Sequence, residues 1–221
     1  PVPGLTEKDF IVREDGQARE VLRVAKDDDP LQVALLVDNS VTMRNKVSDL
    51  RRGMTAFVTA LRPGIEVSVI TLAERPTILV PYTASKAALQ TGIDRVIALN
   101  AGNYLLDGIA EASQGLARRP NVRSAIAVMT GRGPEYSYRE YTDVLRIVRE
   151  SGTPALHVML VGAIDVDTEF ADRTSSIYEG QRDNRGGAER DIVLGRLTKE
   201  TGGRYEEVLS TSALSLKLRQ M

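Results

Sequence analysis

The stretch that decides the fold is residues 31–43, Leu-Gln-Val-Ala-Leu-Leu-Val-Asp-Asn-Ser-Val-Thr-Met. Its apolar run, residues 33–37, is typical of a strand that is buried on both faces of a parallel sheet. Asp38, Ser40 and Thr42 follow at alternate positions, where such a strand ends. Ligands bind at the carboxyl ends of strands in open α/β sheets. One carboxylate and two hydroxyls at this place can direct three oxygens at one point, which suits Mg²⁺.

Further along the chain, apolar runs alternate with segments that have helical periodicity. This alternation predicts an α/β fold: a Rossmann-like, doubly wound, mostly parallel sheet that is flanked by helices. The predicted helices cover residues 47–61, 88–97, 105–116, 141–148, 189–200 and 212–219, and the further predicted strands cover 65–72, 77–80, 125–130, 155–161 and 204–209. Residues 163–187 are polar, glycine-rich and without period, so we expect a long loop there.

The first 28 residues have a different sequence pattern from the rest of the chain. Residues 9–13 and 18–24 are strand-like, and the turn 14–17 between them contains Gly16, which can adopt a positive φ. We therefore predict an N-terminal β-hairpin extension over residues 1–28 and one main domain over residues 29–221. The acidic run 27–29 and Pro30 mark the boundary. Because an isolated hairpin is unstable in water, we expect it to pair with another sheet.

Composition excludes several classes of function. The net charge of −1 gives no electrostatic case for nucleic acid or an anionic membrane, and no apolar stretch is long enough for membrane insertion. The chain has no cysteine, which excludes disulfides and thiolate sites.

Four segments match, in order, the motifs of one known family. Residues 33–43 resemble that family's first strand and its Asp-x-Ser-x-Ser motif, with Thr42 in the last place. Residues 101–109, 126–131 and 201–205 resemble its Gly-Gly-Thr-x-Leu-x-Asp-Ala-Ile, Thr-Asp-Gly and Thr-Gly-Gly-Arg-Tyr segments. The family is the von Willebrand factor type A (VWA) domain, and the resemblance covers residue 31 to the end. Residues 4–10 with Glu14-Asp15-Gly16 further resemble its acidobacterial VWFA-related branch, which implies an exported protein, periplasmic or secreted.

The resemblance implies a metal-ion-dependent adhesion site, but one that is degenerate here. Asp38, Ser40 and Thr42 match the ligands of the first loop, and Asn103 stands where the family has threonine. Gly131 stands where the family has aspartate, so that carboxylate is missing. Two hypotheses remain open. Either a weak Mg²⁺ site survives on Asp38, Ser40, Thr42 and Asn103, or the site is vestigial and Arg132 pairs with Asp38.

An enzyme is the competing interpretation, a metal-dependent hydrolase or phosphoryl-binding protein that uses Asp38. Against it, His157 lies alone in an apolar segment and is interpreted as a hydrogen-bonded core histidine. The Gly131-Arg132-Gly133 segment lacks the pattern of a phosphate loop, so we expect no nucleotide and assign no catalytic residue.

The resemblance therefore implies a non-enzymatic module that binds another protein through the end of the sheet around Asp38. An acidic residue of the partner would complete the metal's coordination or bind Arg132 directly. Tyr136 and Tyr138, with residues 163–187, would form the rim of the binding surface. A structural module that joins neighbouring domains is a third alternative.

Overall fold

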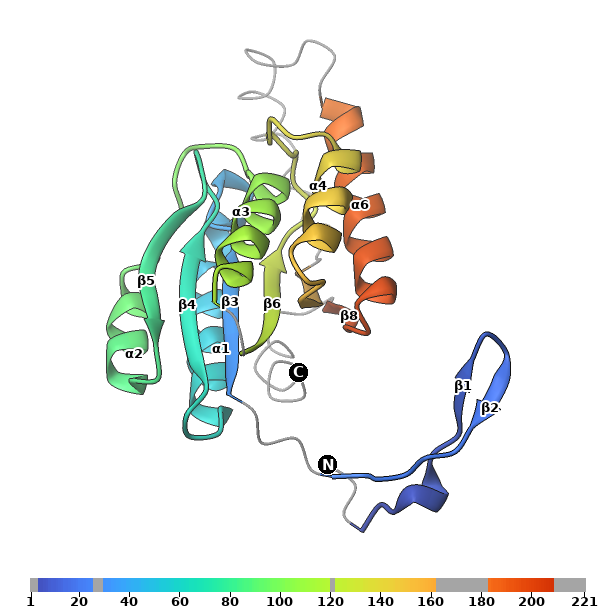
Figure 1. Ribbon diagram of the computed structural model, residues 1–221. Helices are drawn as coiled ribbons and strands as arrows, with labels where there is room; N and C mark the ends of the chain where they lie inside the picture. The colour runs from blue at the N-terminus through green and yellow to red at the C-terminus, as the bar shows by residue number, and fades with distance from the viewer. Residues whose placement is uncertain (1–3, 26–29, 120–121, 162–182, 209–221) are drawn as a thin grey trace.

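The computed structural model describes residues 4–25, 30–119, 122–161 and 183–208 (Figure 1). The strands are β1 (Val12–Glu14), β2 (Gln17–Arg19), β3 (Leu31–Val37), β4 (Glu66–Thr71), β5 (Thr77–Thr83), β6 (Arg123–Thr130), β7 (Ala155–Val161) and β8 (Tyr205–Val208). The α-helices are α1 (Val47–Ala60), α2 (Lys86–Asp94), α3 (Leu105–Ala117), α4 (Tyr141–Glu150) and α6 (Asp183–Glu200), and two short 3₁₀ helices are η1 (Glu7–Asp9) and η2 (Val41–Lys46).

Six strands form one sheet in the order β5-β4-β3-β6-β7-β8. All neighbouring pairs are parallel except β4 and β5, which are antiparallel. The central strands are continuous apolar runs because helices cover both of their faces. The Rossmann-like α/β fold predicted from the sequence is confirmed.

Helices α1 and α2 cover one face of the sheet, and α3, α4 and α6 cover the other (Figure 1). The alternation of side chains along β3 divides the core between these faces. Val33, Leu35 and Val37 pack with α1 and α2, whereas Ala34 and Leu36 pack with the three helices opposite. The core is thus two apolar layers with β3 between them.

The direction of strand order reverses at β3. The chain passes from β3 through α1 to β4 on one side, and later returns through α3 to β6 on the other side. Such a reversal leaves a crevice at the carboxyl ends of the strands. Asp38, the first residue after β3, lies at this point.

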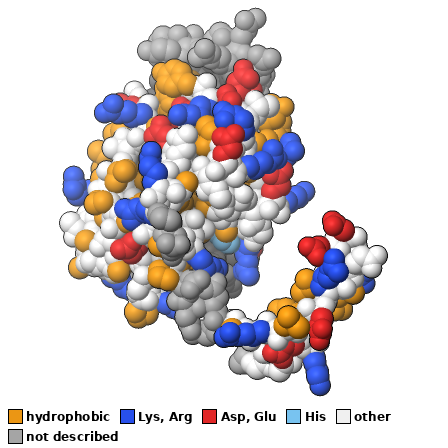
Figure 2. All heavy atoms as spheres, viewed as in Figure 1, with side chains coloured by type: hydrophobic (Ala, Val, Ile, Leu, Met, Phe, Trp, Pro, Cys, Tyr) orange, Lys and Arg blue, Asp and Glu red, His pale blue; other side chains and the backbone are white. Residues whose placement is uncertain are grey.

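The N-terminal hairpin forms, but it is shorter than predicted. Its turn is Asp15-Gly16, both with positive φ (51° and 77°), and Glu14 pairs directly with Gln17. The two strands form a separate sheet and do not pair with the six-stranded one. Ile11 is 83% exposed and Leu22 is 84% exposed. Figure 2 shows apolar side chains on this extension. The domain boundary at residues 28–29 stays a prediction, because residues 26–29 lie outside the described ones.

The C-terminal half of the chain also differs from the prediction in where its last described helix begins. Helix α6 begins at Asp183, earlier than the predicted residue 189, while residues 163–182 and the helix predicted over 212–219 lie outside the described residues. None of the described helices is long and apolar enough to cross a membrane. On the face shown in Figure 2, basic and acidic side chains are interspersed rather than gathered into a basic stripe.

Candidate functional site

Asp38 is the centre of the candidate site, and its side chain is fully buried. Its Oδ1 accepts a hydrogen bond from the backbone N–H of Ser40 at 2.9 Å. Its Oδ2 accepts from Asn103 Nδ2 at 3.0 Å, from Thr130 Oγ1 at 2.9 Å and from the Gly131 N–H at 3.3 Å. All four donors are neutral groups, so dipoles hold this buried carboxylate in place.

The two hydroxyls of the first loop lie beside each other. Ser40 Oγ and Thr42 Oγ1 are 2.9 Å apart and share a hydrogen bond. Ser40 is the N-cap of the short helix η2, and the backbone N–H of the neighbouring Val41 donates to the Ala101 carbonyl at 3.1 Å. This bond attaches the first loop to the segment that carries Asn103.

Asn103 reaches the site from the loop before α3. Its Nδ2 donates to Asp38 and also to Thr130 Oγ1 at 3.1 Å, whereas its Oδ1 is buried and has no hydrogen-bond partner among the described residues. Its own carbonyl accepts the Tyr136 N–H at 2.8 Å. The structure therefore brings together Asp38, Ser40, Thr42 and Asn103, as the sequence predicts.

A core side chain lies against Gly131, the position where the sequence resemblance implies an aspartate in the family. A Cβ built on Gly131 would lie 2.7 Å from the Sδ of Met43, which is fully buried. Arg132 does not fill this place. Its Nη2 donates to Glu207 Oε1 on β8 at 2.8 Å, and this bond raises the pKa of the guanidinium.

The hypothesis that Arg132 pairs with Asp38 is therefore wrong. The reason lies in the register of the sheet. Thr130 pairs with Leu160 on β7, and Leu160 pairs with Glu207 on β8, so the chain leaving β6 passes near the Glu207 carboxylate.

Comparison with known proteins identifies the fold. Residues 33–134 match the model of the von Willebrand factor type A domain. The chain contains a von Willebrand factor type A domain. No curated protein matches the chain significantly.

Solved structures agree on the fold at low sequence identity. A von Willebrand factor type A structure from Catenulispora acidiphila is similar with 16% identity and a TM-score of 0.61, over 87% of this chain and 42% of that chain. The hypothetical protein BatB from Bacteroides thetaiotaomicron gives 16% identity and 0.61, over 86% of this chain and 96% of that one. Proximal thread matrix protein 1 from the mussel byssus, with a zinc-occupied MIDAS motif, gives 17% and 0.63, over 87% and 44%. This chain thus spans less than half of the first and third of these.

VWA domains are generally interaction modules, and the mussel byssus protein holds zinc at its MIDAS motif. Asp38, Ser40, Thr42 and the unpartnered Oδ1 of Asn103 offer oxygens, which hard cations prefer. Charge is lacking, since no group of three or more His, Cys, Asp or Glu side chains among the described residues could hold a metal. The donors thus fit a weakly held divalent cation, and the single carboxylate falls short of what tight binding needs.

The tyrosines at the rim of this VWA domain differ in exposure. Tyr104 lies between two others, with ring centroids 6.5 Å from Tyr136 and 5.9 Å from Tyr138. The ring of Tyr136 covers Gly102, where any Cβ would overlap it, so this tyrosine supports the Asn103 loop. Tyr138 is 81% exposed and is the one open to a partner.

A buried acid that the sequence analysis did not select holds the start of α3. Glu135 is 6% exposed and accepts hydrogen bonds from the N–H groups of Leu105, Leu106 and Ser137 at 3.2, 3.4 and 3.0 Å. Burial raises its pKa to about 7. One signal could have indicated it: Tyr104, at the N-cap, has no oxygen suited to capping, so α3 must be capped from elsewhere.

Asp107 and His157 differ in how their side chains are paired. Asp107 accepts the Tyr138 N–H at 2.9 Å and pairs with Arg139 at 2.7 Å, so it holds the segment after Ser137 against α3. His157 lies in β7, where burial lowers its pKa, but its Nδ1 has no hydrogen-bond partner in the described part of the chain. The expected hydrogen bond is therefore not found at that atom.

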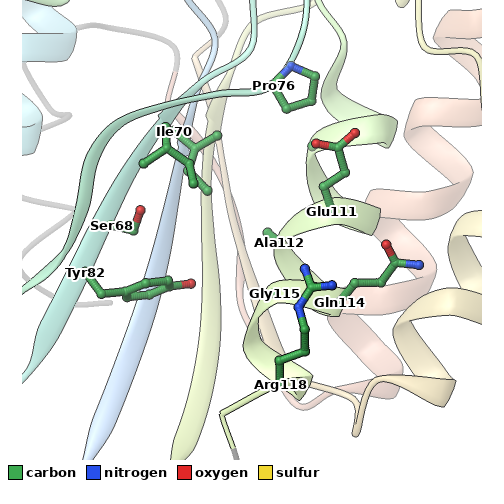
Figure 3. Close-up of a pocket in the computed structure, with 11 residues that line it drawn as sticks. Ser68, Ile70, Pro76, Tyr82, Glu111, Ala112, Gln114, Gly115 and Arg118 are labelled. Atoms are coloured by element: carbon green, nitrogen blue, oxygen red, sulfur yellow. The ribbon is translucent and has the colours of Figure 1, made fainter.

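A separate groove of about 240 Å³ lies between β4, β5 and α3 (Figure 3). Ile70, Ile78 and Tyr82 line it from the strands, and Glu111 and Arg118 from the helix. Burial raises the pKa of Tyr82 to about 12. The groove is separate from the candidate site, because its lining does not include Asp38, Ser40, Thr42 or Asn103. Its lining side chains do not include a nucleophile paired with a base.

Proposed function

We propose that this VWA domain is a non-enzymatic protein-binding module that uses its top face, with weak or lost Mg²⁺ binding. The top face is the end of the sheet where seven residues gather, buried at the centre and exposed at the rim: Asp38, Ser40, Thr42, Asn103, Arg132, Tyr136 and Tyr138. The proposal is carried by the side-chain oxygens of Asp38, Ser40, Thr42 and Asn103, called the oxygen cluster below, which lie at the crevice where strand order reverses. Tyr138, which is exposed, lies at the rim of the same crevice.

A divalent cation, where bound, would be held by Asp38, Ser40, Thr42 and Asn103. It would supply a positive charge that an acidic side chain of the partner can approach. Asn103 would direct its free Oδ1, and the two adjacent hydroxyls would exchange their mutual hydrogen bond for the cation. Because only Asp38 contributes charge, we expect the affinity for Mg²⁺ to be low.

Arg132 offers a route to the same acidic partner without a cation. Its side chain is 51% exposed and that of Glu207 is 38% exposed. An exposed ion pair contributes little stability, so exchange of Glu207 for a partner's carboxylate costs little. Arginine binds a carboxylate through two parallel hydrogen bonds, which favours an acidic partner.

Two features speak against the hydrolase alternative. The neighbours of the Asp38 carboxylate are neutral hydrogen-bond donors rather than a base or a second acid. The one histidine of the chain lies within β7 beside Ala127 in the ladder, with its pKa lowered by burial. A general acid–base pair needs two titratable groups within reach of one substrate atom.

Other parts of the proposal rest on the sequence resemblance alone. These are membership of the acidobacterial VWFA-related branch and a location outside the cytoplasm. The proposed division into residues 1–28 and 29–221 rests instead on the hairpin pattern, the acidic run 27–29 and Pro30. The exposed hairpin is consistent with a further role in joining neighbouring domains.

Site-directed photocrosslinking tests the top face. A photoreactive amino acid replaces Tyr138, and a matched control replaces Ile78, which is 64% exposed on β5. We expect a discrete crosslinked protein from position 138 only, which decreases when Arg132→Ala is added. Crosslinks from position 78 and none from position 138 would contradict the top-face assignment.

A further inference from the structure

Arg190 on α6 is a buried cation that neither the sequence patterns nor the oxygen cluster explains. Its side chain is 6% exposed. Its Nη1 donates to the Gly133 carbonyl at 2.5 Å, and its Nε donates to Asp191 Oδ1 at 3.0 Å. Burying a guanidinium is costly unless its donors are satisfied, so this placement needs a structural reason.

A second contact lies one turn earlier on the same helix face. A Cβ built on Gly186 would lie 2.5 Å from the Glu135 carbonyl oxygen. Residues four apart share a face of a helix, so Gly186 and Arg190 meet the same neighbour. Helix α6 therefore holds residues 131–140, named here the crossing loop, at two points.

The crossing loop in turn touches every segment of the oxygen cluster. The Gly131 N–H donates to Asp38, and the Tyr136 N–H donates to the Asn103 carbonyl. A Cβ built on Gly133 would lie 2.6 Å from Thr42 Oγ1, so the loop lies directly against this hydroxyl. A shift of the loop would thus displace the ligand oxygens of Asp38, Thr42 and Asn103 together.

We propose that Arg190 is a positioning residue that fixes the crossing loop and, through it, the Asp38, Thr42 and Asn103 donors. Helix α6 thereby controls the geometry of the top face, although it contributes no donor to it. The importance of this control for binding rests on the proposed function, whereas the positioning itself does not.

Planar guanidinium geometry suits this task. One nitrogen reaches the Gly133 carbonyl while another stays on Asp191, which is half exposed. A lysine has one nitrogen on a flexible stem and cannot make both contacts in the same fixed geometry. We therefore expect Arg190→Lys to keep the positive charge but recover only part of the positioning.

Residue-resolved amide hydrogen exchange tests the proposal on the whole chain. The variants are Arg190→Met, Arg190→Lys and, as a matched control on the exposed side of α6, Arg196→Met, which loses only a pair with Glu200. Arg190→Met should raise exchange at the amides bonded through the crossing loop by at least about tenfold, with β3 and β6 core amides unchanged. Those amides are Leu105, Leu106, Gly131, Tyr136 and Ser137.

Arg190→Lys should give a smaller increase at the same amides, and Arg196→Met none. A uniform increase over the sheet, or no increase at these amides, would overturn the positioning role. If Arg190→Met does not fold, the same comparison between Arg190→Lys and Arg196→Met decides.

A Mn²⁺ titration of the unmodified chain separates this inference from the proposed function. Selective exchange without any Mn²⁺ binding supports Arg190 and removes the cation from the proposed function. Mn²⁺ binding together with a uniform increase in exchange over the sheet overturns the role of Arg190 and supports the cation in the proposed function. Where Mn²⁺ binds, Arg190→Met should weaken it at least about tenfold, since the lost bond involves a charged group.

Discussion

At the scale of single residues, the site is defined by what surrounds one carboxylate. Asp38 receives four hydrogen bonds from neutral donors and lies beside two hydroxyls that bond each other. The side of the site where a second acid would stand is instead closed by the Met43 thioether against Gly131.

The acid Glu135 makes the stability of the domain depend on pH. Burial raises its folded-state pKa from 4.5 to about 7. Between these values the folded state binds more protons than the unfolded state, so the contribution of this group to stability is largest below pH 4.5. It decreases as pH rises and is lost above about 7.

We predict that Glu135→Gln flattens this dependence. From about pH 5 to about pH 8, the unmodified chain should lose up to about 3 kcal/mol of unfolding free energy relative to the variant. Urea unfolding at both pH values measures the difference, and Glu111→Gln, on the exposed side of α3, is the control. An equal pH slope in Glu135→Gln and the unmodified chain would show that this carboxyl is not the group responsible.

At the residue scale, the sequence was sufficient where a position follows from a strand. Asp38, Ser40 and Thr42 could be placed together because they follow a buried strand, and strand ends gather at one edge of a parallel sheet. Asn103 could be added only from the family resemblance. Partners that are distant along the chain could not be placed. Arg132 meets Glu207 and Arg190 meets Gly133 only through the folded arrangement, which no local pattern encodes.

At the scale of elements, the crossing loop and α3 depend on each other. The helix has no capping side chain at Tyr104, and the loop supplies Glu135 and Ser137 to its first turn instead. Asp107 of the helix accepts loop N–H groups in return. Such reciprocal hydrogen bonds explain how a ten-residue segment without helix or strand is held in one position against α3.

The turn between α6 and β8 gives a prediction at this scale. A Cβ on Gly203 would overlap the Leu156 carbonyl oxygen of β7, which is backbone and cannot move aside cheaply. Gly203→Ala should therefore reduce the unfolding free energy by about 2 kcal/mol or more. Gly195, inside α6, has no atom within 4 Å of a built Cβ, so Gly195→Ala should add about 0.5–1 kcal/mol.

Denaturant midpoints of the two alanine variants measure this contrast. Equal stability of the two variants would mean that β8 can move away from β7 without cost. The glycine pair Gly202-Gly203 was visible in the sequence as a helix stop, but the close approach to β7 depends on how three elements meet.

Element types were predictable where apolar runs or helical periods are long, as for β3, β6, β7 and α1. The ends were less so. Helix α6 begins at Asp183 although residues 183–185 are polar and two glycines follow them. Its later residues Val193, Leu194 and Leu197 are buried and anchor it in the core. The hairpin is shorter than its strand-like sequence, since only six residues pair and no further strand extends them.

At the scale of the whole molecule, one sheet with helices on both faces presents the candidate site at a single edge. The order β5-β4-β3-β6-β7-β8 places β3 at the reversal, which fixes where a ligand can approach. The alternation of strands and helices was enough to predict this architecture. It was not enough to predict that α6, from the far part of the chain, would hold the loop over the site.

The central claim is that the site keeps its oxygen donors but lacks the charge for tight cation binding. Calorimetric titration with Mn²⁺ and Mg²⁺ tests it on the unmodified chain, on Gly131→Asp combined with Met43→Ala, and on Ser40→Ala combined with Thr42→Val. We predict dissociation constants of about 1 mM or weaker for the unmodified chain, at least about tenfold tighter binding with the restored acid, and none without the hydroxyls. Micromolar binding by the unmodified chain, or no gain from the restored acid, would contradict the account.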